Sequence, residues 1–485
     1  MPAAFDGRIL NFIGGELREP LSREYLDCEN PATGEIYAQV PDSGAEDLEV
    51  AVSAAHDAAA GWRDLGAERR ATIMHKLADL IEARLEEFAL AESVDNGKPL
   101  SLARAVDIPR SISNIRFFAD LGKSFRGQEY TSEKSFSYTL RQPFGVVATI
   151  SPWNLPLLLF SWKLAPALAA GNCVIAKPSE VTPMTAFLLS KLANEAGFPA
   201  GVLNVIHGRG PRIGAAITAH PRIPAVSFTG GTATGRSIYQ GAAGLLKKVS
   251  LELGGKNPTI VFDDAHHDLS LQGAKMAGFT NQGQICLCGS RILVQQDVYD
   301  RFRDEFVAQV KQFSIADPLE ETTMMGAMVS KAHMEKVLGY IDLAVQEGGK
   351  ILTGGQRRVL AGRCANGYFI EPTVIEGLRA DCRTNQEEIF GPVVTLMPFK
   401  DEEDAIAIAN STQYGLAASI WTENPERARR VAARIDSGII WVNCWNMRDL
   451  RTPFGGMKNS GVGREGGLHA MEFFTEVKTV CQPAA

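Results

Sequence analysis

Five short β-rich runs alternate with helical stretches between residues 145 and 255, and this alternation limits the possible folds more than any other feature of the chain. The runs are GVVATI, NCVIAKP, GVLNVIHG, AVSFTG and KKVSLELGG. Strands that alternate with helices form a parallel sheet covered on both faces, and ligands bind beyond the carboxyl ends of such strands. We therefore expect one edge of the sheet to gather the polar and glycine residues that lie in or directly after these runs: Asn154, Lys177, His207, Gly208, Gly230, Gly231 and Glu252.

A second set of strands and helices follows from Asn257. Strands are expected in PTIVFDD, SRILVQQ, EEIFGPVVTLMPF, LAASIWT and SGIIWVNC, and helices over residues 269–280, 298–313 and 330–347. Helical periodicity also covers residues 46–95. The pattern therefore predicts two α/β units with a boundary near residue 255.

Local signals refine this outline at two places. In the helix after NCVIAKP, Thr182 is expected to cap the start, Pro183 to take the first position and Gly197 to end the helix. Residues 128–142 and the tail after Phe473 alternate polar with apolar or β-branched residues, as solvent-facing strands do. We expect these two distant strands to pair as a small arm that serves oligomerisation.

Composition and charge exclude several classes of protein. With 485 residues, 45% hydrophobic and 22% charged, the chain has an ordinary globular composition and the length of about three domains. The net charge of −7 leaves no basic surface for nucleic acid. The longest apolar stretch, residues 155–170, is interrupted by Lys163 and two prolines, whereas a bilayer span needs about 20 apolar residues. The first fifteen residues lack an apolar core of signal-peptide length, so we expect a cytoplasmic protein with no membrane partner.

One of the eight cysteines, Cys286, is a candidate nucleophile. It lies in FTNQGQICLCGSR, after a helix expected to end at Gly283. A thiol with an ordinary pKa of about 8.5 is little ionised at neutral pH, so a nucleophilic cysteine needs a helix end, a base or an oxyanion site nearby. The alternative is an inert apolar side chain, which is our interpretation of Cys288. No Cys or His spacing is typical of a metal site, so we expect no metal.

Glu252 is a candidate general base. It stands in an otherwise apolar strand, and two glycines, Gly254 and Gly255, come shortly after it. A buried carboxylate costs several kcal/mol unless it is paired or protonated, so its pKa is expected to be raised. The alternative is an ion pair with Lys248 or Lys256.

Two glycine-rich turns also allow two interpretations. GRGPRIG at 208–214 and FTGGTATG at 228–235 each join a strand to a helix. Either turn could bring helix N-terminal amides to a pyrophosphate, or be the tight turn of any α/β protein.

Seven segments, in order along nearly the whole chain, resemble motifs of the aldehyde dehydrogenase superfamily. They are PWNLP with Asn154, KPSE with Lys177 and Glu180, FTGG, LELGGK with Glu252, GQIC with Cys286, EEIFGPV with Glu388 and Phe390, and PFGGMKNSG at 453–461. The resemblance implies an α/β fold with a Rossmann-type cofactor domain, an α/β catalytic domain and a small β oligomerisation arm in a homodimer or homotetramer. The expected ranges are 1–124 and 144–254 for the NAD-binding domain, 255–468 for the catalytic domain, and 125–143 and 469–485 for the arm.

The resemblance also implies catalytic roles. Cys286 would attack the aldehyde carbonyl, while the side-chain amide of Asn154 and the Cys286 backbone N–H hold the oxyanion. Glu252 would then activate water to hydrolyse the thioester and release a carboxylic acid.

NAD is the implied cofactor. The residues implied to bind it are Trp153, Lys177, Glu180, Gly230, Gly231, Glu388 and Phe390. Lys177 and Glu180 would hold the adenosine ribose, and the Glu180 carboxylate would repel a 2′-phosphate, which favours NAD over NADP. Where the family usually has serine, this chain has Gly231, so a hydroxyl contact to the pyrophosphate is missing and backbone amides are the remaining donors.

Within the superfamily, four segments most resemble 2-aminomuconate and 2-hydroxymuconate semialdehyde dehydrogenases: DIPRS, NCWNMRDL, GQICLCGSR and EFFTEVKT. Arg110 and Arg448 lie in regions that border the aldehyde tunnel of this superfamily. A guanidinium matches a carboxylate at two points, so two arginines would select an aldehyde with an acidic far end. The alternatives are a pair of Arg448 with Asp449 in a solvated loop and a pair of Arg110 with Asp107.

Other functions remain open at this point. The enzyme could act on uncharged or cationic aldehydes, including betaine-type substrates. It could instead pass its thioester to coenzyme A, against which Glu252 argues, or be a catalytically silent binding protein, against which the set of Cys286, Asn154 and Glu252 argues.

Overall fold

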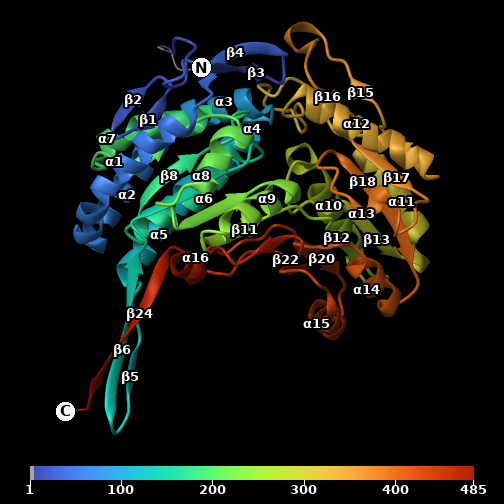
Figure 1. The fold of residues 1–485 in the computed structure, drawn as a ribbon. Helices are drawn as coiled ribbons and strands as arrows, with labels where there is room; N and C mark the ends of the chain where they lie inside the picture. Colours follow the sequence, from blue (N-terminus) through green and yellow to red (C-terminus); the bar gives the residue numbers. More distant parts are fainter. Residues whose placement is uncertain (1–4, 485) are drawn as a thin grey trace.

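The fold is taken from a computed structural model that describes residues 5–484. Residues 1–4 of the N-terminal segment and residue 485 of the expected arm lie outside this range. The first sheet has the order β2-β1-β9-β8-β7-β10-β11-β23 (Figure 1). Its strands are β1 (Asn11–Ile13), β2 (Glu16–Arg18), β7 (Val146–Ile150), β8 (Cys173–Lys177), β9 (Leu203–Val205), β10 (Ala225–Thr229), β11 (Lys248–Glu252) and β23 (Gly461–Val462). The five expected runs form β7 to β11, which pair in parallel, as predicted.

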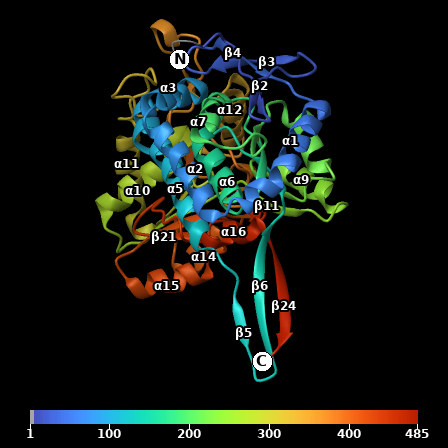
Figure 2. The ribbon, with the colours of Figure 1, turned by 90° about the vertical axis from the view of Figure 1, so that its left-hand side faces the viewer.

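Helices cover both faces of this sheet, as the alternation predicts (Figure 2). On one face lie α2 (Ala67–Glu82), α5 (Ile108–Ser124), α6 (Pro156–Ala169) and α7 (Met184–Ala196). On the other lie α1 (Ala45–Asp64), α8 (Ala215–Ala219) and α9 (Thr232–Ala243). The helical pattern of residues 46–95 is thus three helices, α1, α2 and α3 (Leu85–Asn96).

The predicted start of α7 is wrong by one residue, whereas its end is confirmed. Pro183 is the N-cap and the helix begins at Met184, with no side-chain cap from Thr182. The Thr182 hydroxyl instead donates to the Trp153 carbonyl, 3.3 Å away. Gly197 ends the helix in the left-handed conformation.

The second sheet has the order β14-β17-β18-β13-β12-β20-β21. Its strands are β12 (Pro258–Val261), β13 (Arg291–Gln295), β14 (Lys350–Thr353), β17 (Thr373–Glu376), β18 (Val393–Phe399), β20 (Ala417–Trp421) and β21 (Ile439–Val442). The helices packed around it are α10 (His267–Phe279), α11 (Gln296–Val310), α12 (Lys331–Gln346), α14 (Glu402–Asn410) and α15 (Pro425–Arg434). The expected strand in EEIFGPVVTLMPF is too long, because β18 begins only at Val393. Its first residues form a loop in which Phe390 has a positive φ of 63°.

Shorter elements complete the fold. The strands are β3 (Tyr25–Asn30), β4 (Glu35–Pro41), β15 (Arg357–Arg358), β16 (Phe369–Ile370), β19 (Tyr414–Gly415) and β22 (Met457–Lys458). The helical turns are α4 (Leu100–Leu102), α13 (Arg383–Gln386), α16 (Gly467–Phe473), the π-helical η1 (Ala103–Asp107) and η2 (Gly210–Gly214), and the 3₁₀ turns η3 (Thr280–Gly283) and η4 (Gly362–Cys364). Within residues 5–484, no helix is both long and apolar enough to cross a bilayer.

The two distant polar strands do pair, as predicted. β5 (Glu129–Thr131), β6 (Ser135–Pro143) and β24 (Thr475–Pro483) form an antiparallel sheet that projects from the body (Figure 1). The pairing runs from Thr475 opposite Pro143 to Pro483 opposite Ser135. One segment crosses between the expected units, because β23 lies within residues 255–468 and yet pairs with β11 of the first sheet.

The turn before Cys286 requires glycine at one position. Gly283 has a φ of +68°, and a Cβ there would lie 2.1 Å from the Gly391 carbonyl oxygen. We expect Gly283→Ala to lower the free energy of unfolding by about 2 kcal/mol or more, because both the backbone conformation and the contact are unfavourable.

Urea denaturation measures this change, and Gly61→Ala is the matched control. Gly61 lies inside α1, and no atom lies within 4 Å of the place that an added methyl group would take, so alanine should stabilise the protein by about 0.5–1 kcal/mol. An unchanged midpoint for Gly283→Ala would contradict the expectation.

Candidate active site

Two neighbouring cavities lie at the carboxyl ends of the parallel strands of the first sheet. The larger has a volume of about 660 Å³, and the predicted residues that line it are Trp153, Lys177, Glu180, Gly230 and Gly231. The smaller has a volume of about 240 Å³, and the predicted residues that line it are Trp153, Asn154, Gly230, Gly231, Cys286, Glu388 and Phe390. Of the residues expected at this edge of the sheet, Asn154, Lys177, Gly230 and Gly231 line these cavities, whereas His207, Gly208 and Glu252 do not. Cys286, Glu388 and Phe390 reach the smaller cavity from the second unit.

Lys177 and Glu180 form an ion pair at the wall of the larger cavity. The Lys177 ammonium donates to the Glu180 carboxylate at 3.1 Å and to the Pro178 carbonyl at 3.0 Å. The other Glu180 oxygen accepts from the Gly210 N–H at 3.2 Å. Burial acts to raise the pKa of Glu180, but the Lys177 charge and these hydrogen bonds outweigh it and lower the pKa. Glu180 is thus a fixed carboxylate at neutral pH.

The turn at Gly230 and Gly231 leads into the N-terminus of α9. A Cβ at Gly230 would lie 2.4 Å from the Phe228 ring, so only glycine fits there. Gly231 is the N-cap of α9, has extended backbone angles and has open space around its Cα. The first N–H groups of this helix lack intrahelical partners and favour an anion.

The Glu388 carboxylate and the Phe390 ring come from the loop before β18. Glu388 accepts from the Gly255 N–H at 2.9 Å, and burial raises its pKa. A Cβ at Gly254 would lie 2.3 Å from a Glu388 oxygen, so the first glycine after the Glu252 strand makes room for this carboxylate.

Phe390 is held by its neighbours in spite of its positive φ. Its ring meets the Trp153 ring edge-on at 5.2 Å, and its carbonyl accepts from His333 at 2.7 Å. Burial lowers the pKa of His333 to about 4, so the ring is neutral and donates one N–H. His333 was not predicted from the sequence.

Cys286 lies in a loop whose main chain is fixed from two sides. The Asn257 amide donates to the Cys286 carbonyl at 2.7 Å and to the Cys288 carbonyl at 2.9 Å. Asn281, at the start of the same loop, has a positive φ of 53°, which is uncommon outside glycine. The Cys286 side chain is only partly buried and reaches the smaller cavity. Asn257 was missed in the sequence, although its place directly after LELGGK is a usable signal.

The pKa of the Cys286 thiol is raised, mainly by burial and further by Glu388 and Glu252. The Arg448 charge acts in the opposite direction. The nearby helix end that the sequence suggested is therefore not sufficient to lower the pKa of this thiol. The thiol is protonated at neutral pH in this structure.

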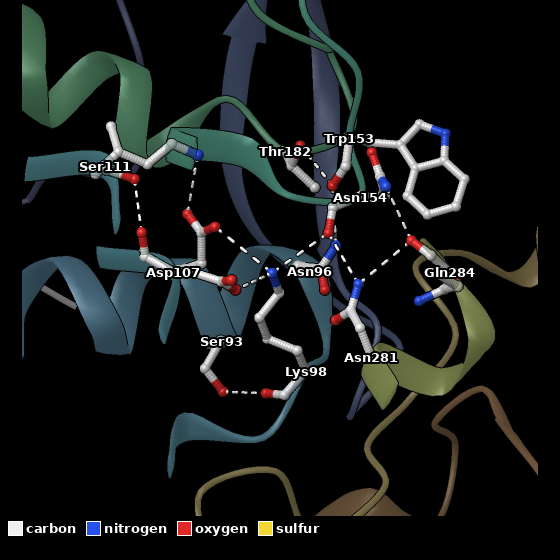
Figure 3. A network of polar contacts seen from close by, with 12 residues as sticks. Ser93, Asn96, Lys98, Asp107, Ser111, Trp153, Asn154, Thr182, Asn281 and Gln284 are labelled. Carbon is white, nitrogen blue, oxygen red and sulfur yellow. Dashed lines mark hydrogen bonds and ion pairs between the residues drawn. The ribbon is translucent and has the colours of Figure 1, made fainter. Parts of the chain in front are cut away.

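The side-chain amide of Asn154 is directed toward the same loop (Figure 3). It donates one hydrogen to the Gln284 carbonyl at 2.9 Å, and an amide NH₂ has two. The second hydrogen has no partner among residues 5–484, and neither has the Cys286 backbone N–H. These two free donors are suited to one oxygen atom beside the thiol.

Glu252 is buried and unpaired. Neither carboxylate oxygen has a hydrogen-bond partner within the described part of the chain. Lys248 donates instead to the carbonyls of Glu472 and Thr475, so the predicted alternative of an ion pair with Lys248 is wrong. Lys256 also makes no hydrogen bond to it, because the Lys256 ammonium has no partner within that range. The pKa of Glu252 is raised well above its usual value, first by burial and then by the charge of Glu465.

Glu465 belongs to a buried group that sequence analysis missed. The Lys163 ammonium donates to the Glu465 carboxylate at 2.6 Å and to the Ser227 hydroxyl at 3.0 Å. Lys163 counteracts the effect of Glu465 on the pKa of Glu252. A lysine in the otherwise apolar helix α6 is the signal that could have found it.

Arg448 lies close enough to Arg110, Cys286 and Glu252 for their charges to act on its pKa. The Arg448 guanidinium is 4.1 Å from the centre of the Phe454 ring and 5.3 Å from that of Trp162. Burial and the neighbouring charge of Arg110 lower the pKa of Arg448 to about 10, while Cys286 and Glu252 act to raise it. Arg448 therefore remains a cation at neutral pH.

Neither arginine makes the ion pair considered as its alternative. Asp449 pairs with Arg451 at 2.6 Å, and the Asp107 carboxylate pairs with the buried Lys98. Both guanidinium groups are partly buried and have no carboxylate partner among residues 5–484. That part of the chain also contains no group of three or more His, Cys, Asp or Glu side chains arranged to hold a metal ion.

Comparison with known proteins agrees with this geometry. Residues 18–480 match the profile of the aldehyde dehydrogenase family. The chain is 47% identical to 2-aminomuconic semialdehyde dehydrogenase of Mus musculus, over 97% of each chain. It is 45% identical to 2-hydroxymuconic semialdehyde dehydrogenase of Pseudomonas sp. (strain CF600), over 98% of this chain and 99% of the relative. An NAD⁺ complex of aldehyde dehydrogenase from Bacillus cereus superimposes with a TM-score of 0.96 at 40% identity, over 99% and 97% of the chains. The chain therefore belongs to the aldehyde dehydrogenase family.

Proposed function

We propose that this enzyme oxidises a carboxylate-bearing semialdehyde of the 2-hydroxymuconate or 2-aminomuconate type to the carboxylic acid, with NAD as electron acceptor. One observation carries the chemistry: two free N–H donors, on Asn154 and on the Cys286 backbone, stand beside a thiol that reaches a cavity. The relatives named above support the substrate class.

The first stage is the addition of the Cys286 sulfur to the aldehyde carbon, for which the thiol first releases its proton to solvent water. The carbonyl oxygen gains negative charge as the carbon–sulfur bond forms, and the two free N–H groups stabilise it. Because these donors are fixed before the substrate arrives, no reorganisation is needed at the moment of reaction. Loss of hydride from the same carbon then leaves a thioester on Cys286.

The second stage is hydrolysis, for which Glu252 serves as general base. Its raised pKa makes the ionised form a stronger base than an exposed carboxylate. Ionised Glu252 takes a proton from water, the resulting hydroxide attacks the thioester carbon, and the carbon–sulfur bond breaks to release the acid. This unpaired base supports transfer to water over transfer to coenzyme A.

The residues at the larger cavity fit NAD. Its volume of about 660 Å³ and the open N-terminus of α9 suit a pyrophosphate near the backbone. Lys177 and Glu180 would hold the adenosine ribose, and Glu388 with Phe390 and Trp153 the nicotinamide end. When bound, the nicotinamide supplies a hydride acceptor. The fixed negative charge of Glu180 favours NAD over NADP.

The substrate proposal depends on the two arginines. Arg448 and Arg110 supply cations without carboxylate partners among residues 5–484, and Arg448 affects the pKa values of Cys286 and Glu252. A substrate carboxylate would pair with them and offset the cost of burying two neighbouring positive charges. Uncharged or betaine-type aldehydes would leave that cost in place. NADH formation measured across muconate-type semialdehydes, uncharged aldehydes and betaine aldehyde tests this proposal.

For the arginine site, we expect Arg448→Met to raise KM for a carboxylate-bearing semialdehyde by about 10–100-fold, the value of a hydrogen bond to a charged group. KM for an uncharged aldehyde should change less than about threefold, because no ion pair is lost. The control is Arg451→Met, which removes an exposed arginine of the same loop that pairs with Asp449. Equal effects of Arg448→Met on both substrates would refute the proposed role.

For the base, Glu252→Gln should lower steady-state kcat by about 10²–10⁴-fold and preserve the first burst of NADH. In the unmodified enzyme, Glu252 must lose its proton to act, so kcat should rise as the pH increases through its raised pKa. The variant should lack this rise. Stopped-flow absorbance separates the burst from the steady state, and loss of the burst itself would assign Glu252 to the first stage instead.

For the cofactor, Gly231→Ser should lower the Kd of NAD by about fivefold, the value of one added hydrogen bond of about 1 kcal/mol. The position has room for a side chain and the backbone angles of an N-cap, where serine is favoured. Titration of the intrinsic fluorescence measures the Kd. Gly244→Ser, at the far end of the same helix and equally open, should leave it unchanged.

A further inference from the structure

Lys98 is a fully buried cation that the proposed mechanism does not use. It follows the end of α3, and Figure 3 shows it beside Asp107 and Asn154, which are also buried. The carboxylate of a further buried residue, Glu92, is nearby. Its ammonium pairs with the Asp107 carboxylate and is 3.6 Å from that of Glu92. Its third contact is the main-chain carbonyl of Asn154, to which it donates at 3.3 Å.

Neutralising the carboxylates does not by itself account for this arrangement. Burying one cation and two carboxylates is costly, and apolar residues of similar volume often replace such groups without loss of stability. What apolar residues would not supply is the donor to the Asn154 carbonyl. The hydrogen bond to the main-chain carbonyl of Asn154 is therefore the distinctive feature of Lys98.

Asn154 is held at both its main chain and its side chain. Its carbonyl accepts from Lys98 and, at 3.0 Å, from the Asn281 amide, while its own amide donates to Gln284. The residue lies between the end of β7 and the start of α6, outside any regular element. Without Lys98, the Asn154 carbonyl would keep only the hydrogen bond from Asn281, which belongs to the loop that carries Cys286.

The partners of Lys98 are in turn anchored to helices. Asp107 ends the π-helical turn η1, and its carbonyl accepts from the Ser111 hydroxyl of α5 at 2.7 Å. Glu92 accepts from the N–H of Leu157, in the first turn of α6, at 3.3 Å. The ammonium is thus fixed relative to α3, α5 and α6, and can transmit that position to Asn154.

We propose that Lys98 is a positioning residue for the oxyanion site, which acts by holding the Asn154 carbonyl so that the free amide hydrogen of Asn154 meets the developing oxyanion. This inference rests on the role proposed for Asn154. A displacement of about 1 Å at a reacting group can cost about 10²-fold in rate. Removal of Lys98 should therefore lower the reaction rate by less than removal of the Asn154 amide does. Once the amide is absent, removal of Lys98 should cause little further loss of rate.

A double-mutant cycle tests this dependence. The variants are Lys98→Met, Asn154→Ala and the two combined, and the readout is the burst rate of NADH with propanal at saturating NAD. We expect Lys98→Met to slow the burst by about 10–100-fold with little change in KM for NAD. In the Asn154→Ala background, Lys98→Met should slow the burst by less than about twofold, because the amide that Lys98 positions is absent.

Two further variants separate positioning from general damage. Arg70→Met removes another buried cation that donates to main-chain carbonyls, those of Trp62 and Arg63, and should lower stability without slowing the burst. Lys98→Met combined with Asp107→Asn removes one charge of each sign and should show the same loss of burst rate. This pair serves the same cycle if Lys98→Met alone does not fold.

The outcomes are distinct. An unchanged burst in folded Lys98→Met, or an equal loss in both backgrounds, would overturn the inference and leave the proposed role of Asn154 intact. An unchanged burst in Asn154→Ala would overturn both. A loss confined to the background that retains Asn154 supports the positioning role.

Discussion

The Asn257 side chain joins the loop that carries Cys286 to the second sheet through three hydrogen bonds. It donates to the carbonyls of Cys286 and Cys288 and accepts from the Ala417 N–H of β20 at 3.0 Å. From the first sheet, Asn154 donates to the same loop at Gln284. The Cys286 thiol thus lies where the two sheets are connected through amide side chains. If one of these hydrogen bonds broke, both the buried amide and its backbone partner would be left without a partner, which is costly. The hydrogen bonds therefore fix the relative position of the two sheets at the site.

Buried charge recurs around this junction. Lys98, Lys163, Lys256 and Arg291 are among the largest fully buried side chains of the described residues. Lys98 contacts the Asn154 carbonyl, Lys163 holds Glu465, and Arg291 donates to the Lys256 carbonyl at 2.8 Å. Burial lowers the pKa of Lys256 to about 7, and the nearby Glu388 counteracts part of that effect. Ionic groups inside a protein are rarely the most effective way to gain stability. The buried charges of this protein instead lie beside the residues of the candidate site.

The sequence predicted the elements that follow from periodicity, and its failures have local physical causes. The five parallel strands and the pairing of β6 with β24 required only alternation and the rules of parallel sheets. The strand expected from Glu387 failed because Phe390 adopts a positive φ stabilised by Trp153 and His333, which no local pattern reveals. The cap at Thr182 failed because Pro183 takes the N-cap position and the helix begins at Met184, one residue later than expected. For the site, the place of Asn257 directly after LELGGK and the charge of Lys163 in α6 are signals that the sequence offers. The contacts of Lys98 are tertiary and have no such signal.

The segment from Arg448 to Glu465 brings charge to two places in the candidate site. The guanidinium of its first residue lies over the Phe454 ring, and the carboxylate of its last residue acts on the pKa of Glu252. Between them, Gly461 of β23 pairs with Glu252 itself. Because Arg448 and Glu465 both act on the pKa of Glu252, a change at either end of this segment also changes the balance of charge around that buried carboxylate.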